Sequence, residues 1–405
     1  MKTITIKEIS GTITSPAGFQ AAGIHCGVKR KRNDLGIIYS EIPASAAAVY
    51  TKNIIQAAPI TVTKESLEQS GNIQAVIVNS GNANACTGKK GLEDARDIRD
   101  AVAKHFQVLS NHVAVASTGI IGLPMPMEKI MPAISMLKPS GKKNAAAQFA
   151  ESVLTTDTFK KKICYQTEIE GKIVTMGGVA KGSGMIEPNM GTMLGFLTTD
   201  ANITPSELQR ALKQAVDGTF NCITVDGDTS TNDMVLALAN GLAENDSLSP
   251  EHPDWEAFTG LIHHVCEDLA KMIARDGEGA TKLISVEVAG AKDDCEARKV
   301  AKTVVGSSLV KTAVFGVDAN WGRIIAAIGY SGANVNPQTI DAAIGPIKML
   351  EDSQPLPFSE KDAKAYLQKD DIHIAIDLKN GPGQGKAWGC DLTYDYVRIN
   401  ASYRT

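Results

Sequence analysis

The chain has 405 residues, of which 43% are hydrophobic and 21% are charged, and its formal net charge is −4 at pH 7. Such a chain can bury a sizeable core and fold as two or three structural units, or as one large unit with a small one. The mild negative charge argues against nucleic acid as the main partner. The single basic run, residues 29–32, is interpreted as a solvated turn, with a phosphate or nucleic-acid contact as the alternative.

The N-terminal segment predicts a strand and no targeting signal. Residues 1–19 alternate Thr and Ile in the manner of a strand and lack the apolar core of a signal peptide. No apolar run in the sequence approaches the roughly 18 residues that a membrane helix needs. We therefore expect a protein that acts in the cytoplasm, without a membrane partner.

Further along the chain, apolar periodicity predicts both helices and strands. Helical spacing covers residues 91–106, 206–220 and 254–277. Short β-branched segments predict strands over residues 75–80, 112–118, 171–178, 222–227, 282–290 and 371–381. This mixture indicates an α/β or α+β protein with layered sheets. Because the segments become shorter and more charged after about residue 290, we expect a main domain over about 1–285 and a smaller C-terminal domain over 286–405.

The seven cysteines are odd in number, and none belongs to a Cys-x-x-Cys pair. A disulfide framework and a structural zinc site are therefore not expected. His263, His264 and Cys266 stand close together, as metal ligands do, but they lie within the helical pattern of residues 254–277, where Cys266 belongs to the apolar face. We interpret them as satisfied core residues.

Several predicted strands end in loops rich in Gly, Asn, Ser and Thr. These loops cover residues 78–88, 117–122, 225–233 and 275–282. Their backbone N–H groups and hydroxyls suit anions and oxyanions, although each loop taken alone is also typical of an ordinary turn. The third loop contains Asp226, Asp228 and Asp233 but lacks the spacing and final Glu of a calcium loop, which leaves magnesium as an alternative there.

Common catalytic motifs are absent from the sequence. There is no Walker A motif, no Gly-x-Gly-x-x-Gly before a helix, no Gly-x-Ser-x-Gly elbow and no His-Glu-x-x-His. With only seven histidines, a hydroxyl nucleophile needs another base, and the α-amine of an N-terminal residue is one solution. Such an amine titrates near pKa ~7.7–8.0, against ~10.4 for lysine, so it can act as a base at neutral pH.

The dipeptide Gly191-Thr192 suits a reaction that creates such an N-terminus. The threonine hydroxyl attacks the preceding carbonyl, the acyl group shifts from N to O, and water cleaves the ester. Glycine places no Cβ in the way of this attack. On local grounds alone, the same dipeptide is also typical of an ordinary strand start.

The surrounding sequence resembles a known family. Residues 178–201, GVAKGSGMIEPNMGTMLGFLTTDA, are similar to the signature of the ornithine acetyltransferase family, also called the arginine-biosynthesis glutamate N-acetyltransferases. Eight further segments resemble the family in order and extend the likeness over nearly the whole chain: TSPAGFQAAGIHCGVKR, VIVNSGNANACTG, VASTGIIG, TTDTFKK, CITVDGDTSTNDMVL, ARDGEGATKLI, DANWGRI and DYVRINASYRT.

The resemblance implies a fold, an assembly and a reaction. It implies the layered α-β-β-α sandwich of this family and of DmpA-like enzymes. It also implies a precursor that cleaves itself between Gly191 and Thr192, giving an α chain (1–191) and a β chain (192–405) that assemble as an α2β2 heterotetramer. The family transfers acetyl from N2-acetylornithine to glutamate through an acetyl-threonine intermediate. Some members also accept acetyl-CoA, and no metal or other cofactor is implied.

The resemblance also assigns residue roles. It implies Thr192 as nucleophile and Thr118 with Gly119 as the oxyanion hole. The substrate-contacting positions are Thr158, Lys181, Thr192, Glu278, Asn400 and Thr405, where Lys181 meets the substrate carboxylate and Glu278 its amino end. Thr156 is the alternative to Thr158 in the same motif. The chain departs from the family at Gly191, since most members have alanine there, and we expect cleavage all the same.

Two other functions fit part of this pattern. One is an aminopeptidase or amidase that uses the same self-cleaved nucleophile with water as acceptor. The other is a non-catalytic binding protein that has kept the fold.

Overall fold

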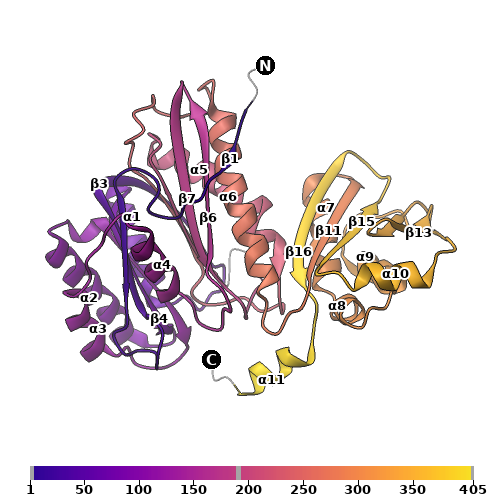
Figure 1. Ribbon diagram of the computed structural model, residues 1–405, viewed down its shortest axis with the longest axis horizontal. Coiled ribbons are helices and arrows are strands. Elements are labelled where there is room, and N and C mark those ends of the chain that lie inside the picture. Colours follow the sequence, from indigo (N-terminus) through magenta and orange to yellow (C-terminus); the bar gives the residue numbers. More distant parts are fainter. Residues whose placement is uncertain (1–3, 188–192, 403–405) are drawn as a thin grey trace.

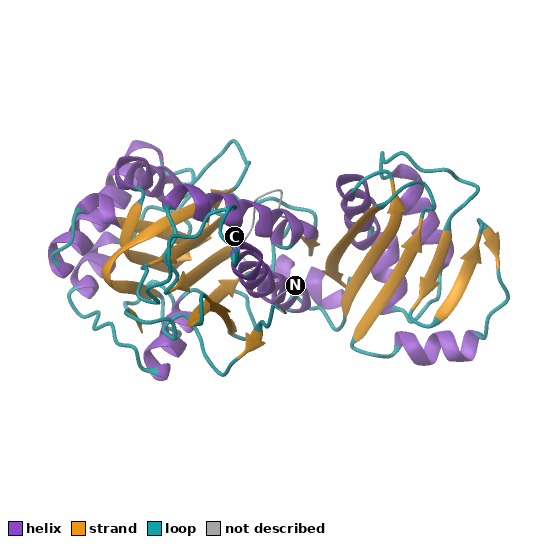
Figure 2. Cartoon of the chain, turned by 90° about the horizontal axis from the view of Figure 1, so that it is seen from above, coloured by secondary structure: helices purple, strands orange, loops and turns teal. Residues whose placement is uncertain are grey.

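The computed structural model describes residues 4–187 and 193–402, and these residues form two lobes, each built on one β-sheet (Figures 1 and 2). The larger sheet contains β1 (Lys7–Glu8), β2 (Phe19–Ile24), β3 (Leu35–Tyr50), β4 (Asn72–Asn82), β5 (Val113–Ile120), β6 (Lys161–Ile169), β7 (Lys172–Lys181), β8 (Leu194–Thr199) and β10 (Met234–Ala239). Its lobe contains the helices α1 (Ala58–Ser70), α2 (Gly88–Phe106), α3 (Met127–Ile134), α4 (Lys143–Ser152), α5 (Pro205–Gly218) and α6 (Trp255–Arg275), with short 3-10 turns at Ser110–His112 and Phe220–Cys222.

The larger sheet runs in the order β1-β6-β7-β8-β10-β3-β4-β5, and β2 pairs with β3. Strand β3 is 16 residues long and joins the two halves of this sheet. Its last residues pair with β10, from Ser45↔Ala239 to Tyr50↔Met234, whereas its earlier part pairs with β2 and β4. The register with β4 shifts between Tyr39 and Ala44, at the change from one half to the other.

Alternating side chains give this sheet two distinct apolar faces. Phe196 of β8 and Val76 of β4 face a core that the two halves share with Phe149 of α4, and the rings of Phe149 and Phe196 meet edge to face at 5.7 Å. The next residue of each strand faces outward: Leu197 packs toward α5 and α6, and Ile77 toward α1, α2 and α3. Helices therefore cover both outer faces of a folded sheet, as Figure 1 shows, and the predicted layered α-β-β-α architecture is confirmed.

The smaller sheet runs β14-β13-β12-β15-β11-β16-β9. Its strands are β9 (Ile223–Thr224), β11 (Leu283–Ala291), β12 (Asp341–Ile344), β13 (Ile347–Glu351), β14 (Gln354–Pro355), β15 (Asp371–Asp377) and β16 (Gly383–Cys390), and the accompanying helices are α7 (Asp294–Gly306), α8 (Ser308–Phe315), α9 (Trp321–Tyr330), α10 (Glu360–Leu367) and α11 (Tyr394–Ser402). The boundary expected at 285/286 falls inside β11, and β9 joins this sheet from an earlier part of the chain.

The three predicted helices correspond to α2, α5 and α6, and five of the six predicted internal strands correspond to β4, β5, β7, β11 and β15. The prediction of a strand over 222–227 is correct only for Ile223 and Thr224, which form β9. Val225 instead donates its N–H to the Ile186 carbonyl at 2.7 Å, which turns the chain toward the other lobe.

Within its described part, from residue 4 onward, the expected N-terminal strand is limited to β1, and Thr12 and Ser15 form a turn in which Ser15 N–H donates to the Thr12 carbonyl at 2.9 Å. All seven cysteines are free thiols. Cys266 is fully buried in the α6 face that contacts the core, which confirms its interpretation as a core residue. For His263 and His264 the same interpretation is wrong, because the His263 side chain is 42% exposed and pairs with Glu267, and His264 is exposed to solvent. Among the described residues, no helix is long and apolar enough to cross a membrane.

Candidate active site

A polar pocket of about 210 Å³ lies between the lobes, at the ends of β5 and β7 and beside α11. It brings together five of the residues that the family resemblance assigns, from four separate parts of the chain: Thr118, Gly119, Lys181, Glu278 and Asn400. Gly191, Thr192 and Thr405 lie outside the described residues.

Thr118 and Gly119 end β5 at the rim of this pocket. Strand β5 is parallel to β4, with Thr118 beside Ser80 and Gly119 beside Gly81. Gly119 has φ +133°, and a Cβ there would lie 2.4 Å from the carbonyl carbon of Gly81, so only glycine fits. The Thr118 side chain forms no hydrogen bond within the described part of the chain, which leaves its hydroxyl available to a ligand.

Lys181 and Glu278 place opposite charges in the same pocket. Lys181 ends β7 and is 7% exposed, and Glu278 follows α6 and is 8% exposed. Neither side chain has an ion-pair partner in residues 4–187 and 193–402; Glu278 accepts a hydrogen bond of 2.8 Å from the Asn400 amide. Because unpaired buried charges are costly, this pair is complementary to a ligand that carries both a carboxylate and an ammonium group.

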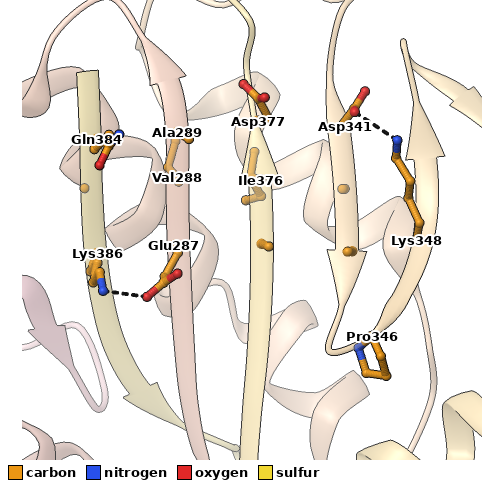
Figure 3. Close-up of a pocket in the computed structure, with 14 residues that line it drawn as sticks. Glu287, Val288, Ala289, Asp341, Pro346, Lys348, Ile376, Asp377, Gln384 and Lys386 are labelled. Atoms are coloured by element: carbon orange, nitrogen blue, oxygen red, sulfur yellow. Dashed lines mark ion pairs between the residues drawn. The ribbon is translucent and has the colours of Figure 1, made fainter. Parts of the chain in front are cut away.

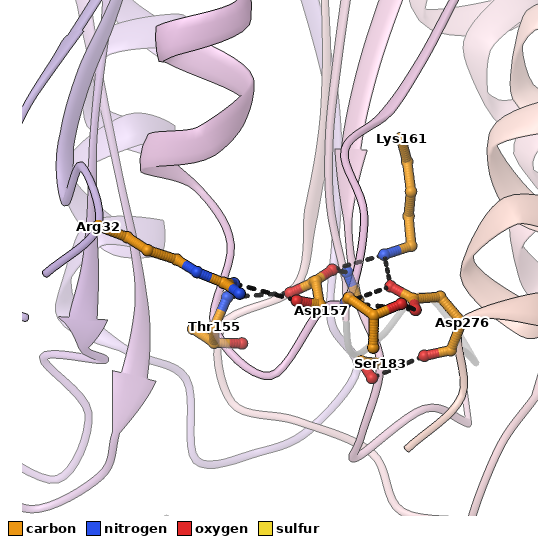
Figure 4. A network of polar contacts seen from close by, with 8 residues as sticks. Arg32, Thr155, Asp157, Lys161, Ser183 and Asp276 are labelled. Carbon is orange, nitrogen blue, oxygen red and sulfur yellow. Dashed lines mark hydrogen bonds and ion pairs between the residues drawn. The ribbon is translucent and has the colours of Figure 1, made fainter. Parts of the chain in front are cut away.

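A buried ionic network supports the floor of the pocket (Figure 4). Lys161 is fully buried and bridges the carboxylates of Asp157, at 2.7 Å, and Asp276. Burial alone would raise the pKa of Asp157, but the ammonium groups of Lys161 and Lys181 outweigh it and hold that pKa well below its usual range. Arg32 adds a hydrogen bond of 3.1 Å to the Asp157 carbonyl.

The structure places Thr158 in this network and not on the pocket wall. Its N–H donates to the Asp276 carboxylate at 3.0 Å, and its hydroxyl donates to the same group. Thr155 and Thr156 line the pocket instead. The motif is therefore at the site, but the alternative residue Thr156 is the one that faces the cavity, because the carboxylate of Asp276 holds Thr158.

Residues that sequence reasoning did not assign also line the pocket. They are Ile121, Thr155, Gly184, Met185, Asp226, Asp228, Ser230, Asn232 and Tyr396. The signal for several of them was the glycine-rich loops, since 117–122, 225–233 and 275–282 all contribute to the wall. The remaining loop, 78–88, does not line the pocket but contacts a residue that does. Asn232 of the wall donates to the carbonyl of Ala83 in this loop at 2.6 Å, and to the carbonyl of Ser117 at 2.9 Å.

The aspartates of the 225–233 loop have separate tasks. Asp226 accepts the backbone N–H groups of Met185 and Ile186 at 2.7 and 2.8 Å, and the Tyr396 hydroxyl at 3.4 Å. Asp233 is buried, and one of its carboxyl oxygens has no hydrogen-bond partner within residues 4–187 and 193–402. Burial raises the pKa of Asp233 well above its usual range, against the opposing effect of Lys181. No cluster of metal-binding side chains occurs among the residues that the structure describes, and magnesium gains no support there.

A second hollow, of about 450 Å³, lies on the open face of the smaller sheet (Figure 3). Four of its charged side chains pair with one another: Lys386 with Glu287 at 2.7 Å, and Lys348 with Asp341 at 3.2 Å. These pairs leave less free charge for a ligand than Lys181 and Glu278 do. The pocket between the lobes is therefore the stronger candidate for the active site.

The fold and this pocket define a mixed α/β protein whose small polar pocket presents both an ammonium and a carboxylate group. The family model described as the ArgJ family matches residues 20–405, and the chain belongs to this family. This membership confirms the family and the pathway, arginine biosynthesis, that the motifs predict.

Relatives match over nearly their full lengths. The arginine biosynthesis bifunctional protein ArgJ of Geobacillus kaustophilus is 61% identical over 395 residues, which is 98% of this chain and 96% of that protein. Its counterpart in Halalkalibacterium halodurans is 61% identical over 401 residues, 99% of this chain and 98% of that protein. A crystal structure of the Bacillus halodurans ArgJ protein matches with 65% identity and a TM-score of 0.51, over 51% of this chain and 98% of that chain.

Proposed function

We propose that the protein transfers an acetyl group from N2-acetyl-L-ornithine to L-glutamate, which yields L-ornithine and N-acetyl-L-glutamate. The observation that carries this proposal is that Lys181 and Glu278, which form no ion pair among the described residues, lie in one small pocket beside Thr118 and Gly119. Both substrates are amino acids and present a carboxylate. Lys181 binds that carboxylate, and Glu278, held by Asn400, receives the amino end.

The proposed chemistry proceeds in two similar half-reactions. The Thr192 hydroxyl attacks the acetyl carbonyl, its own α-amine takes the proton, and ornithine leaves from an acetyl-Thr192 intermediate. Glutamate then attacks this ester and carries the acetyl group away. The Thr118 hydroxyl and the Gly119 N–H stabilise the oxyanion in both steps, each worth roughly 3–4 kcal/mol. A pocket of about 210 Å³ suits a scheme in which the two amino acids bind in turn.

The nucleophile requires a cut between Gly191 and Thr192. Support comes from the solved Bacillus halodurans relative, because its chain aligns over 98% of its length with only 51% of this one, as expected of a protein made of two chains. Denaturing electrophoresis and intact mass measurement of fresh protein test the cut. Two fragments are expected from the natural chain and one intact chain from Thr192→Ala, whereas a single full-length band from active protein contradicts the proposal.

The remaining properties follow from the same assignment. We propose an α2β2 assembly in the cytoplasm, acetyl-CoA as a second donor, and no resident metal or cofactor, since the hydroxyl, the amine and the hydrogen-bond donors supply the chemistry. The word "bifunctional" in the relatives' names supports a second donor. We also keep the division into a main domain and a smaller C-terminal domain, with its boundary near β11.

One assay separates the alternatives. Purified protein receives acetylornithine or acetyl-CoA as donor, with and without glutamate, and released ornithine and N-acetylglutamate are measured. Glutamate-dependent release supports transfer. Ornithine release that is the same with and without glutamate indicates an amidase. Unchanged ornithine formation by the Thr192→Ala variant excludes Thr192 as the nucleophile.

A further inference from the structure

We propose that Lys161 is a positioning residue that fixes the separation between Lys181 and Glu278, and thereby sets the length of the diamino acid that the pocket accepts. This inference rests on the proposed function, because it concerns the same pocket. Lys161 itself does not line the cavity; it begins β6 and is fully buried beneath it.

The two carboxylates that Lys161 bridges belong to the segments that hold the two pocket charges. On one side, Asp157 accepts the N–H of Gly182 at 2.7 Å, and Gly182 directly follows Lys181. Asp157 also directly follows Thr156 of the pocket wall. A shift of Asp157 therefore moves the backbone that carries the pocket ammonium.

On the other side, Asp276 precedes Glu278 by two residues. Ser183 ties this segment to the end of β7 twice: its hydroxyl donates to the Asp276 carbonyl at 2.6 Å, and its carbonyl accepts the Glu278 N–H at 3.0 Å. The side chain of Asp276 faces Lys161, so the ammonium group of Lys161 and the two Ser183 hydrogen bonds together set the distance between the segments.

The charges in this network explain why the ammonium of Lys161 is needed. Without it, two buried carboxylates would face each other with no cation between them, and removal of one partner from a buried ion pair is strongly destabilising. The carboxylates would separate or bind a proton, and either change would strain the two Ser183 hydrogen bonds and alter the distance that they and Lys161 together set between the segments of Lys181 and Glu278. A loosened pocket discriminates poorly between ligands that differ by one methylene, a difference otherwise worth about 10–200-fold.

The test compares Lys161→Met, which removes the charge and keeps the length, with Lys161→Arg, which keeps the charge. Lys311→Met is the matched control, because Lys311 is also buried but lies in α8, outside the network. The kcat and KM are measured for N2-acetylated 2,4-diaminobutyrate, ornithine and lysine with glutamate as acceptor. Calorimetry measures the binding of the three free diamino acids to the same proteins.

We expect the preference of Lys161→Met for the ornithine compound to fall at least tenfold, mainly through KM, with Lys161→Arg closer to the natural protein and Lys311→Met unchanged. An equal loss for all three donors, or the same behaviour of the Met and Arg variants, overturns the inference. If Lys161→Met does not fold, Asp276→Asn weakens the same bridge and must show the same loss of preference. Length-selective binding by the natural protein without transfer overturns the proposed function alone.

Discussion

The carboxylate of Glu278 occupies the space that a side chain at position 184 would need. A Cβ on Gly184 would lie 2.4 Å from both the carboxyl carbon and Oε2 of Glu278. Gly184→Ala must therefore push this carboxylate out of place. We expect KM for acetylornithine to rise about tenfold or more, since a displaced charge loses a charge-assisted hydrogen bond of roughly 1.5–3 kcal/mol.

The matched control for this variant is Gly329→Ala in α9, where an added Cβ meets nothing within 4 Å. Steady-state kinetics of the two proteins check the prediction. An unaltered KM in Gly184→Ala would show that Glu278 does not contact the substrate.

Lys181→Met removes the ammonium group of the pocket. We expect KM for both acetylornithine and glutamate to rise by about 10–100-fold, because each carboxylate loses the same cation. Kinetics with both substrates varied measure the effect, and the folded fraction is followed by circular dichroism. If only one of the two substrates is affected, the shared-pocket scheme is wrong.

The stability of the protein should fall at acid pH through Asp157. Its pKa is lowered in the folded state, so its contribution is present above the ordinary value of about 3.9 and is lost as pH falls through that value toward the folded one. We expect the free energy of unfolding of the natural protein to drop by about 1 kcal/mol more than that of Asp157→Asn between pH 6 and pH 3. Urea unfolding across this range measures the difference, and parallel pH profiles would contradict the assignment.

The pKa of Asp233 is shifted in the opposite direction to that of Asp157, so its effect on stability has the opposite pH dependence. Its pKa is raised in the folded state, so folding is favoured most below about pH 3.9 and loses stability as pH rises toward the folded value. Asp233→Asn stays neutral throughout. Relative to the natural protein, this variant should gain about 1 kcal/mol or more between pH 4 and pH 8. Urea unfolding at both ends of the range checks this, and a constant difference would mean that Asp233 is ionised in the folded protein.

Much of the fold was predictable because it is encoded locally. The spacing of Phe258, Ile262 and Val265 marks one face of α6, and all three are buried there. The strand expected over 222–227 stops early because Val225 hydrogen-bonds to Ile186, a contact between distant residues that no local sequence pattern shows.

The site divides in the same way. The glycine-rich loops identified much of the wall, whereas the presence of Asn400 at the site came only from the family resemblance. Its contact with Glu278, 122 positions away in sequence, came from the structure. Lys161 bridges Asp157, which is four residues away, and Asp276, which is 115 residues away, and only the i,i+4 half of this bridge is visible in the sequence.

Strands β8 and β10 lie between β7 and β3, although both follow residue 192 and their neighbours precede residue 188. During synthesis, the facing edges of β7 and β3 remain unpaired until residue 239 has left the ribosome. Exposed strand edges invite pairing with other chains, so this interval is the one in which aggregation threatens the nascent protein. If the segments before and after residue 192 were made as separate chains, the same strand edges would be exposed, and no covalent link would hold β8 and β10 near them. Continuity of the chain through residues 188–192 thus protects the sheet while it assembles, and is dispensable only once the central strands are in place.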